Sequence, residues 1–284
     1  MLAAVIVTVG GFFSPYLLER GMSGNTLILA LGALVSGLLC FHGAFSFGGR
    51  MRWLMVAGAV AALYVLLITG SRGPLLSYGA AMTLYAVVMG YRYFGLRWAL
   101  SRIVVSLLLF AAVVTLMATI SPRLMERYST VVESLSNPGV GSIAKENVYI
   151  RLVLYETGLR AFLDRPLTGY GRQNAVSAVG ERRDGTPAKY FVYSHLHNGY
   201  LTDLIASGVL GLLSLLAVLL APLFVFWRTR PVVFGGVLCL VLAYVFYGAT
   251  NLLFYHDVVT FLFLALLCVF NALAAADTAE KQMG

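Results

Sequence analysis

Eight runs of apolar residues, each long enough to cross a membrane, constrain this chain more than any other feature. A membrane-spanning helix needs about 20 predominantly apolar residues. Inside a bilayer every backbone polar group must be hydrogen-bonded within the protein, so runs of this kind form helices. We therefore expect an all-α polytopic membrane protein. The expected spans are residues 2–18, 25–47, 53–70, 74–91, 102–120, 199–226, 232–252 and 258–275.

The composition excludes an ordinary soluble protein. Hydrophobic residues make up 60% of the chain and charged residues 11%, whereas soluble domains carry about 25% charged residues. The net charge of +8 is explained by the positions of the arginines around the spans, so we expect no nucleic-acid partner. The three cysteines all lie in apolar runs, which excludes a disulfide framework and a cysteine metal site.

Arginines concentrate in alternate connections between the spans, and this predicts the orientation. Short cytoplasmic loops of membrane proteins are enriched in Lys and Arg. The basic connections contain Arg50 and Arg52, then Arg92, Arg97 and Arg102, then Arg228 and Arg230. We therefore expect both termini inside and the long connection outside, and the N-terminus lacks the features of a signal peptide. The expected organisation is five spans in 1–120, an outer loop in 121–198, three spans in 199–275 and an inner tail in 276–284.

The outer loop contains one amphipathic helix, expected from about Glu146 to Asp164. Apolar residues recur at steps of three and four, at Val148, Leu152, Tyr155, Leu159 and Phe162. This stripe should lie on the bilayer surface or against the bundle. At about 100° per residue, Arg151 falls at the edge of the stripe, whereas Arg160 points away from it. A tight turn with two glycines follows, over residues 165–172.

A short outer turn, Thr69–Pro74, joins the third and fourth spans. Its Gly, Ser and Pro have structural uses as a helix end, a helix cap and a first-turn residue. Arg72 has no such use in a turn. It either extends toward lipid headgroups or forms an anion site, because a guanidinium beside a helix N-terminus suits a phosphate.

The stretch from Ser194 to Gly211 brings a histidine to the rim of a membrane helix. Asn198 can cap that helix, and His197 precedes the cap. A histidine has an ordinary pKa near 6.5 and suits a general base, although a lone histidine is more often a satisfied polar group. Asp203 lies inside the helix and is expected to be paired or to line a cavity. His195 is a further candidate.

Other outer arginines are candidates of lower rank. Arg160 and Arg172 follow Arg151 in sequence and could add to an anion site, although a solvated surface charge is the alternative for each. Two arginines from different outer elements would hold a pyrophosphate between them. No paired carboxylates or other metal-ligand pattern stands on the outer side, so we expect no metal and no cofactor.

The pattern resembles the O-antigen ligase and polymerase superfamily of bacterial membrane glycosyltransferases. Three elements are similar to the family's and occur in its order. They are the turn Thr-Gly-Ser-Arg-Gly-Pro-Leu-Leu at residues 69–76, the helix from Arg151 followed by Pro-Leu-Thr-Gly-Tyr-Gly at residues 166–171, and His197-Asn198 with Gly208 and Gly211 downstream.

The resemblance implies a GT-C-like fold in the bacterial inner membrane, with its site facing the periplasm. Such ligases transfer a glycan from an undecaprenyl-pyrophosphate carrier to lipid A–core oligosaccharide, without a metal. By this resemblance Arg72 and Arg151 would hold the pyrophosphate and His197 would position or deprotonate the acceptor hydroxyl. The expected partners are the lipid-linked donor, the lipid A–core acceptor and membrane lipids. Arg160, Arg172, His195, Asn198 and Asp203 are the expected substrate-binding residues.

Two other functions stay open. An O-antigen polymerase would use the same donor and an acceptor still on its carrier; the His-Asn and glycine pattern favours a ligase. A transporter or flippase of an anionic lipid-linked substrate predicts charged or broken helices at mid-membrane depth, and the spans are almost free of charge there. The family usually has more spans than this chain, and the shortfall is N-terminal. The sequence is therefore expected to be a fragment, a late start or a compact relative.

Overall fold

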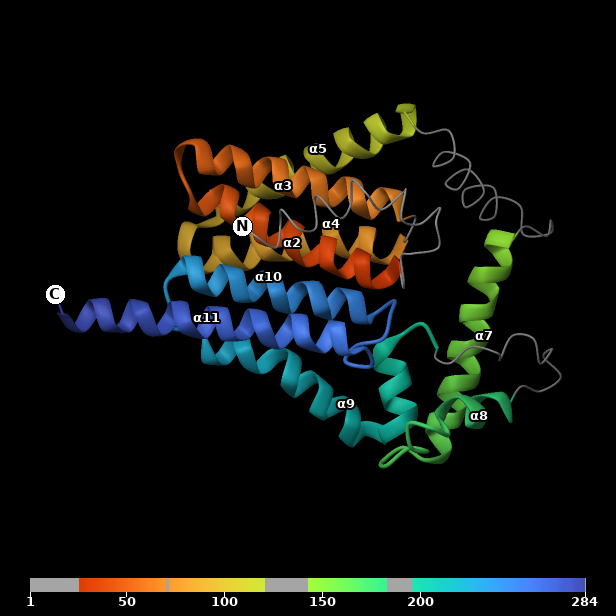
Figure 1. The fold of residues 1–284 in the computed structure, drawn as a ribbon. Helices are drawn as coiled ribbons and strands as arrows, with labels where there is room; N and C mark the ends of the chain where they lie inside the picture. The colour runs from red at the N-terminus through yellow and green to blue at the C-terminus, as the bar shows by residue number, and fades with distance from the viewer. Residues whose placement is uncertain (1–25, 70–71, 121–142, 183–195, 284) are drawn as a thin grey trace. The chain divides into compact units, whose positions relative to one another are not determined.

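The computed structural model describes residues 26–69, 72–120, 143–182 and 196–283, and all its regular elements are helices (Figure 1). In chain order they are α2 (Thr26–Ser46), α3 (Gly49–Ile68), α4 (Arg72–Met89), the π-helical turn η1 (Gly90–Phe94), α5 (Leu96–Ile120), α7 (Ile143–Asp164), α8 (Ala175–Gly180), α9 (Gly199–Val225), α10 (Pro231–Gly248) and α11 (Asp257–Met283).

The protein is a multi-pass membrane protein. Within the described residues, α2, α3, α4, α9, α10 and α11 are long and apolar enough to cross a membrane. They coincide with six of the eight spans expected from the sequence. The expected first span, residues 2–18, lies outside the described residues. The expected fifth span, residues 102–120, is helical as part of α5. The structure describes the backbone of this helix but not all of its side chains.

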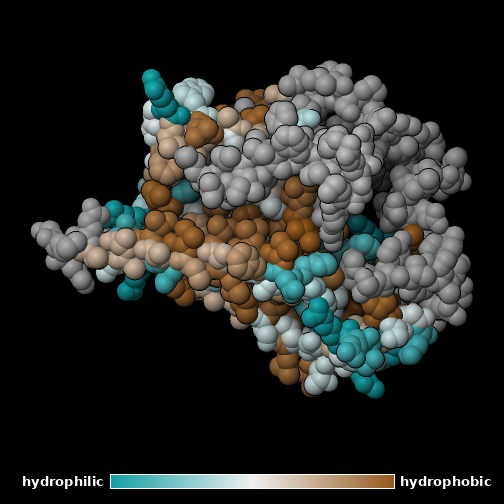
Figure 2. Space-filling view, viewed as in Figure 1, coloured by the Kyte–Doolittle hydropathy of each residue, from teal (hydrophilic) through white to brown (hydrophobic). Residues whose placement is uncertain are grey.

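The chain divides into two compact units. The first contains the helices up to residue 120 together with residues 220–247 and 253–284, and the second contains residues 121–219 and 248–252. In the first unit α2 packs against α3 and α4, and α4 packs against α5 (Figure 1). Hydrophobic side chains cover much of its visible surface, as a helix bundle in lipid requires (Figure 2).

Small residues allow the helices of the first unit to approach closely. A Cβ at Gly37 of α2 would lie 2.8 Å from the Ala62 side chain of α3 and 2.8 Å from the Tyr78 ring of α4. Helices in lipid associate by close packing rather than by a hydrophobic driving force, and small residues permit it. Gly37 therefore marks the point where three helices meet.

One polar side chain inside the first unit, His42, is hydrogen-bonded at both ring nitrogens. Its Nε2–H donates to the Val232 carbonyl at 2.8 Å, so its Nδ1 accepts from the Tyr85 hydroxyl at 2.6 Å. This is the arrangement of a neutral imidazole. His42 therefore serves as a polar link between α2, α4 and the start of α10.

The second unit has its own apolar core, formed by α7, α8 and the first turns of α9. The buried residues are Ile150, Leu154, Ala161, Ala175, Val179, Leu196, Ile205 and Ala206. This result corrects the predicted stripe on α7. Leu159, a member of that stripe, is exposed, and the buried side of the helix is centred instead on Leu154 and Ala161. Both sides of α7 carry apolar residues, so periodicity alone could not select between them.

Candidate functional site

The helix that carries the His-Asn pair is broken, not continuous. Sequence alone predicted one span over 199–226, but Gly208 within α9 has φ 66° and ψ −164°, which is not helical. A break frees backbone groups that an α-helix would pair, because each N–H donates to the carbonyl four residues before it. Within a membrane protein those groups need other partners.

The turn after α7 supplies these partners. The N–H of Tyr170 donates to the Ile205 carbonyl at 3.0 Å, and the N–H of Gly171 donates to the Ala206 carbonyl at 2.8 Å. In return the N–H of Val209 donates to the Pro166 carbonyl at 2.8 Å. We call these three bonds the Gly208 junction. They join α7 to α9 through the backbone, on both sides of the break.

The junction explains why glycines stand at positions 169, 208 and 211. A Cβ at Gly208 would collide with the Leu167 carbonyl, and a Cβ at Gly169 would collide with the Ile205 carbonyl oxygen. Both residues also have positive φ values, which glycine adopts without steric cost. A Cβ at Gly211 would collide with the Ser207 side chain. The glycines of the motif thus shape the backbone.

A second set of contacts, made by side chains, stabilises the turn of residues 166–171. Two guanidinium groups contact the Tyr170 ring, because those of Arg165 and Arg182 lie 4.8 Å and 5.1 Å from its centroid. Arg182 also donates to the Tyr170 hydroxyl at 2.6 Å and to Asp164 Oδ2 at 2.7 Å. The hydrogen bond to Asp164 raises the pKa of Arg182. α8, which ends beside Arg182, is thereby connected to the end of α7.

At the start of α9, Asn198 acts as the helix cap that the sequence predicted. Its Oδ1 accepts the N–H of Leu201 at 3.0 Å. His197 before it has φ 54°, a conformation uncommon for residues other than glycine. Residues held in such conformations cost roughly 1–3 kcal/mol and concentrate at functional sites. Leu196, buried in the core of the second unit, anchors the chain just before this turn.

The structure brings α7 against His197. The Tyr155 hydroxyl donates to the His197 carbonyl at 3.3 Å. Arg151 lies one turn before Tyr155 on the same helix, and side chains four residues apart on a helix are neighbours. Arg151 is exposed and His197 is half-buried. The pairing of these two elements could not be predicted from sequence, since Tyr155 was assigned to an apolar stripe.

The other predicted site residues occupy different settings. Arg160 is exposed and donates to Glu156 at 2.7 Å on the same helix, and Arg172 is exposed. Asp203 is half-buried within α9, and His195 lies outside the described residues. Arg72 begins α4, as the turn chemistry predicted, with Pro74 in the first turn. Arg72 belongs to the first unit, so its approach to Arg151 and His197 stays a prediction.

Histidine, cysteine and acidic side chains form no group suited to a metal ion within the described parts of the chain. Of the predicted site residues in the second unit, Arg151 carries a guanidinium and His197 an imidazole. A guanidinium suits an anionic leaving group and an imidazole suits a general base, so their roles stay predictions.

Comparison with known families identifies the family of the chain. The family model described as O-antigen ligase matches residues 57–216, which include the Arg72 turn, α7, the junction and the His-Asn pair. The chain belongs to the O-antigen ligase family. Curated proteins compared with the chain include no match. Membership makes it a glycan-transferring membrane enzyme, of a domain type that O-antigen ligases and polymerases share.

The match gives the Gly208 junction a place within the family domain. Both sides of the junction, residues 166–171 and 205–209, lie inside the matched region. In this O-antigen ligase family member, therefore, Gly208 breaks α9 at the point where the turn of residues 166–171 binds it. The sequence signal for the break was available as Ser207-Gly208 within an apolar run, because glycine weakens a helix interior.

Proposed function

We propose that the protein transfers an O-antigen glycan from undecaprenyl pyrophosphate to lipid A–core oligosaccharide, at the periplasmic face of the inner membrane. The observation that carries the proposal is the contact between α7 and the His197 turn. The Tyr155 hydroxyl donates to the His197 carbonyl, and Arg151 is the residue one helical turn before Tyr155 on α7, which supports a shared site. Family membership supplies the class of reaction.

In the proposed reaction the acceptor hydroxyl oxygen attacks the anomeric carbon of the donor glycan. His197 takes the hydroxyl proton as the new glycosidic bond forms. The bond between the anomeric carbon and the pyrophosphate oxygen breaks, and both of its electrons leave with undecaprenyl pyrophosphate. Arg72 and Arg151 bind the negative charge that develops on this leaving group, which stabilises the transition state.

The Gly208 junction supports this chemistry by holding the site rigid. A catalytic pair must be held within a fraction of an ångström, and backbone hydrogen bonds hold two elements more tightly than mobile side chains do. The strained His197 backbone and the Asn198 cap then define the direction of the imidazole. Asp203, one turn further into α9 than Asn198, is proposed to line the acceptor side, and Arg172 and His195 to extend the donor side.

Complementation of a ligase-deficient bacterial strain tests the proposal. The wild-type chain should restore long-chain lipopolysaccharide on a gel. Arg72→Ala, Arg151→Ala and His197→Ala should each reduce it at least 100-fold, the range of a lost transition-state contact. Arg228→Ala removes an exposed arginine outside the matched region and should leave it unchanged. Membrane insertion of each variant is measured by immunoblot.

The same strains separate the proposed reaction from its relatives. A null ligase strain accumulates unligated polymer on the carrier, and the wild-type chain should remove this material. A polymerase would instead restore long chains in a strain whose lipopolysaccharide carries only a single repeat unit. If the three variants remain active while inserted normally, the assignment of the site is wrong. Failure of the wild-type chain itself to restore capped chains would contradict the proposed reaction.

A further inference from the structure

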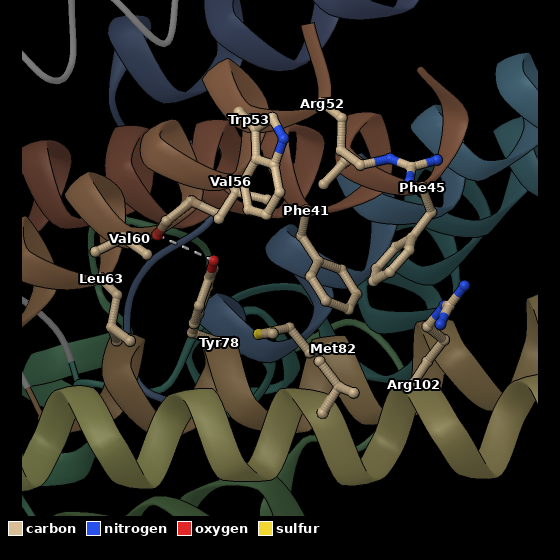
Figure 3. Close-up of a pocket in the computed structure, with 13 residues that line it drawn as sticks. Phe41, Phe45, Arg52, Trp53, Val56, Val60, Leu63, Tyr78, Met82 and Arg102 are labelled. Atoms are coloured by element: carbon tan, nitrogen blue, oxygen red, sulfur yellow. Dashed lines mark hydrogen bonds between the residues drawn. The ribbon is translucent and has the colours of Figure 1, made fainter. Parts of the chain in front are cut away.

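A cavity of about 290 Å³ lies inside the first unit, and none of its lining residues is assigned to glycan transfer (Figure 3). It is enclosed by α2, α3, α4 and α5. The walls are aromatic and aliphatic, with Phe41, Trp53, Leu63 and Met82 among them. Two arginines, Arg52 of α3 and Arg102 of α5, are its charged lining residues.

The apolar end of the cavity is lined mainly by aliphatic and aromatic side chains. The hydroxyl of Tyr78, which reaches this part, already donates to the Ala59 carbonyl at 3.4 Å (Figure 3). Tyr78 itself is only 2% exposed. Hydrocarbon suits this end best, because a buried polar group without a partner costs free energy.

The charged end has the opposite character. In Figure 3 the guanidinium groups of Arg52 and Arg102 both lie at the Phe45 end of the cavity. Arg102 stands 4.3 Å from the Phe45 ring centroid, and its Nε is buried with no hydrogen-bond partner within the described residues. Arg52 Nε donates to the Phe47 carbonyl at 3.2 Å, and this hydrogen bond restricts the orientation of the guanidinium group.

The helices around the cavity cannot neutralise these charges. Residues 20–125, which contain all four helices, include no Asp and no Glu. Arg52 also repels Arg102 electrostatically. Two like charges at the mouth of an apolar cavity, without a carboxylate on any lining helix, are complementary to an anion whose other part is hydrocarbon.

The dimensions match one leaflet of a bilayer. Along α3 the lining extends from Arg52 to Leu63, about 16 Å at a rise of about 1.5 Å per residue. Half of a hydrocarbon core is about 15 Å thick. Trp53, at the charged end, is 70% exposed, and tryptophan prefers the membrane–water interface. Val60 and Val105 are also exposed, so lipid can reach the cavity from the side.

We propose that this cavity binds one anionic glycerophospholipid, with its phosphate between Arg52 and Arg102 and an acyl chain along the apolar walls. The volume lies at the small end of the roughly 300–1,000 Å³ of ligand pockets, which admits one acyl chain rather than a long polyprenyl carrier. The predicted cytoplasmic position of both arginines places the lipid in the inner leaflet, where anionic headgroups attract such residues. The site is independent of the transfer reaction.

Thermal unfolding of the purified full-length chain in neutral detergent tests the proposal. Phosphatidylglycerol should raise the unfolding temperature, whereas phosphatidylcholine of the same acyl chains and inorganic phosphate should not. Replacing both arginines, Arg52→Ala with Arg102→Ala, should weaken the apparent affinity for phosphatidylglycerol about 30-fold. The matched control, Arg50→Ala with Arg97→Ala, removes two exposed arginines from the same two helices and should retain the effect.

A second variant addresses the acyl chain without changing charge. Ala59→Leu adds volume to the cavity wall and should reduce the number of phospholipid molecules retained in native mass spectrometry from one to none. For each variant the unfolding temperature with lipid is compared with that of the same variant without lipid. A change in the stability of the variant alone therefore does not affect the conclusion. Equal stabilisation by phosphatidylcholine, or equal loss in the Arg50 and Arg97 control, would overturn the proposal.

Discussion

In the bundle of α2 to α5 the helices meet through side chains, whereas in the second unit the turn after α7 meets α9 through the backbone. Gly37 faces the ends of two side chains, Ala62 and Tyr78. Gly208 faces the Leu167 carbonyl, with the three bonds of the junction around it. Side-chain packing can relax when a group is added, but the Leu167 carbonyl lies in a backbone turn that hydrogen bonds fix on both sides, so it cannot move aside as easily. The first unit should tolerate changes that the second does not.

The largest expected effect is that of Gly208→Ala. The added Cβ meets the Leu167 carbonyl at a positive φ, so strain and collision together should lower the unfolding free energy by about 4 kcal/mol. Ligase activity in the complementation assay should be lost. Gly171→Ala is the matched control, because Gly171 has φ 83° but no atom within 4 Å of an added Cβ. It should cost only the backbone strain, about 1–2 kcal/mol.

Equal destabilisation by Gly171→Ala and Gly208→Ala would mean that backbone strain, and not the close approach of Leu167, explains the glycine at position 208. Chemical denaturation of the purified variants in detergent gives the two values. Limited proteolysis within residues 166–171 should increase in Gly208→Ala, because the junction would open.

Gly37→Ala tests the side-chain packing of the first unit. Overpacking against side chains typically costs about 1–3 kcal/mol, and alanine recovers up to about 1 kcal/mol of helix propensity. We expect a net loss of about 1 kcal/mol with ligase activity retained. The same denaturation measurement applies. A loss as large as that of Gly208→Ala would remove the distinction between the two units.

Asn198→Ala should have a smaller effect on stability and a larger one on activity. Loss of a helix cap costs about 1 kcal/mol, and it would loosen the His197 turn. Asn198→Asp restores a cap oxygen and should recover both properties. If aspartate restores stability but not long-chain lipopolysaccharide, Asn198 also contacts the substrate through its amide group, as the sequence interpretation held.

The smallest expected effect is that of Arg160→Ala. It removes an exposed pair with Glu156 at an i, i+4 spacing, which contributes about 0.3–0.5 kcal/mol. Complementation should fall by less than twofold if the pair is only a surface contact. A tenfold fall with unchanged stability would show that Arg160 binds the donor.

Much of the fold could be predicted from the sequence, because apolar length predicts spans directly. Six of the eight predicted spans coincide with helices long and apolar enough to cross a membrane. The helix ending at Asp164, the start of α4 near Pro74 and the Asn198 cap were predicted and confirmed. Each depends on residues close together in the sequence.

The features that were missed depend on residues far apart. The break at Gly208 is compensated by residues 166–171, and a hydropathy pattern does not record which turn supplies the hydrogen bonds. The buried side of α7 depends on Leu196 and Ile205, which neighbour it only in three dimensions. The same limit applies to the site. Arg151 and His197 could be selected by chemistry, whereas the contact of Tyr155 with the His197 carbonyl could not.

The central claim is that Arg72, Arg151 and His197 form one transfer site, and cross-linking tests it most directly. In a chain whose cysteines are replaced, Arg72→Cys is combined with His197→Cys and treated with a short bifunctional maleimide in membranes. Arg97→Cys with His197→Cys is the control, because Arg97 is predicted on the cytoplasmic side. The account predicts rapid cross-linking of the 72–197 pair and none of the 97–197 pair. Equal, low cross-linking of both pairs would contradict it.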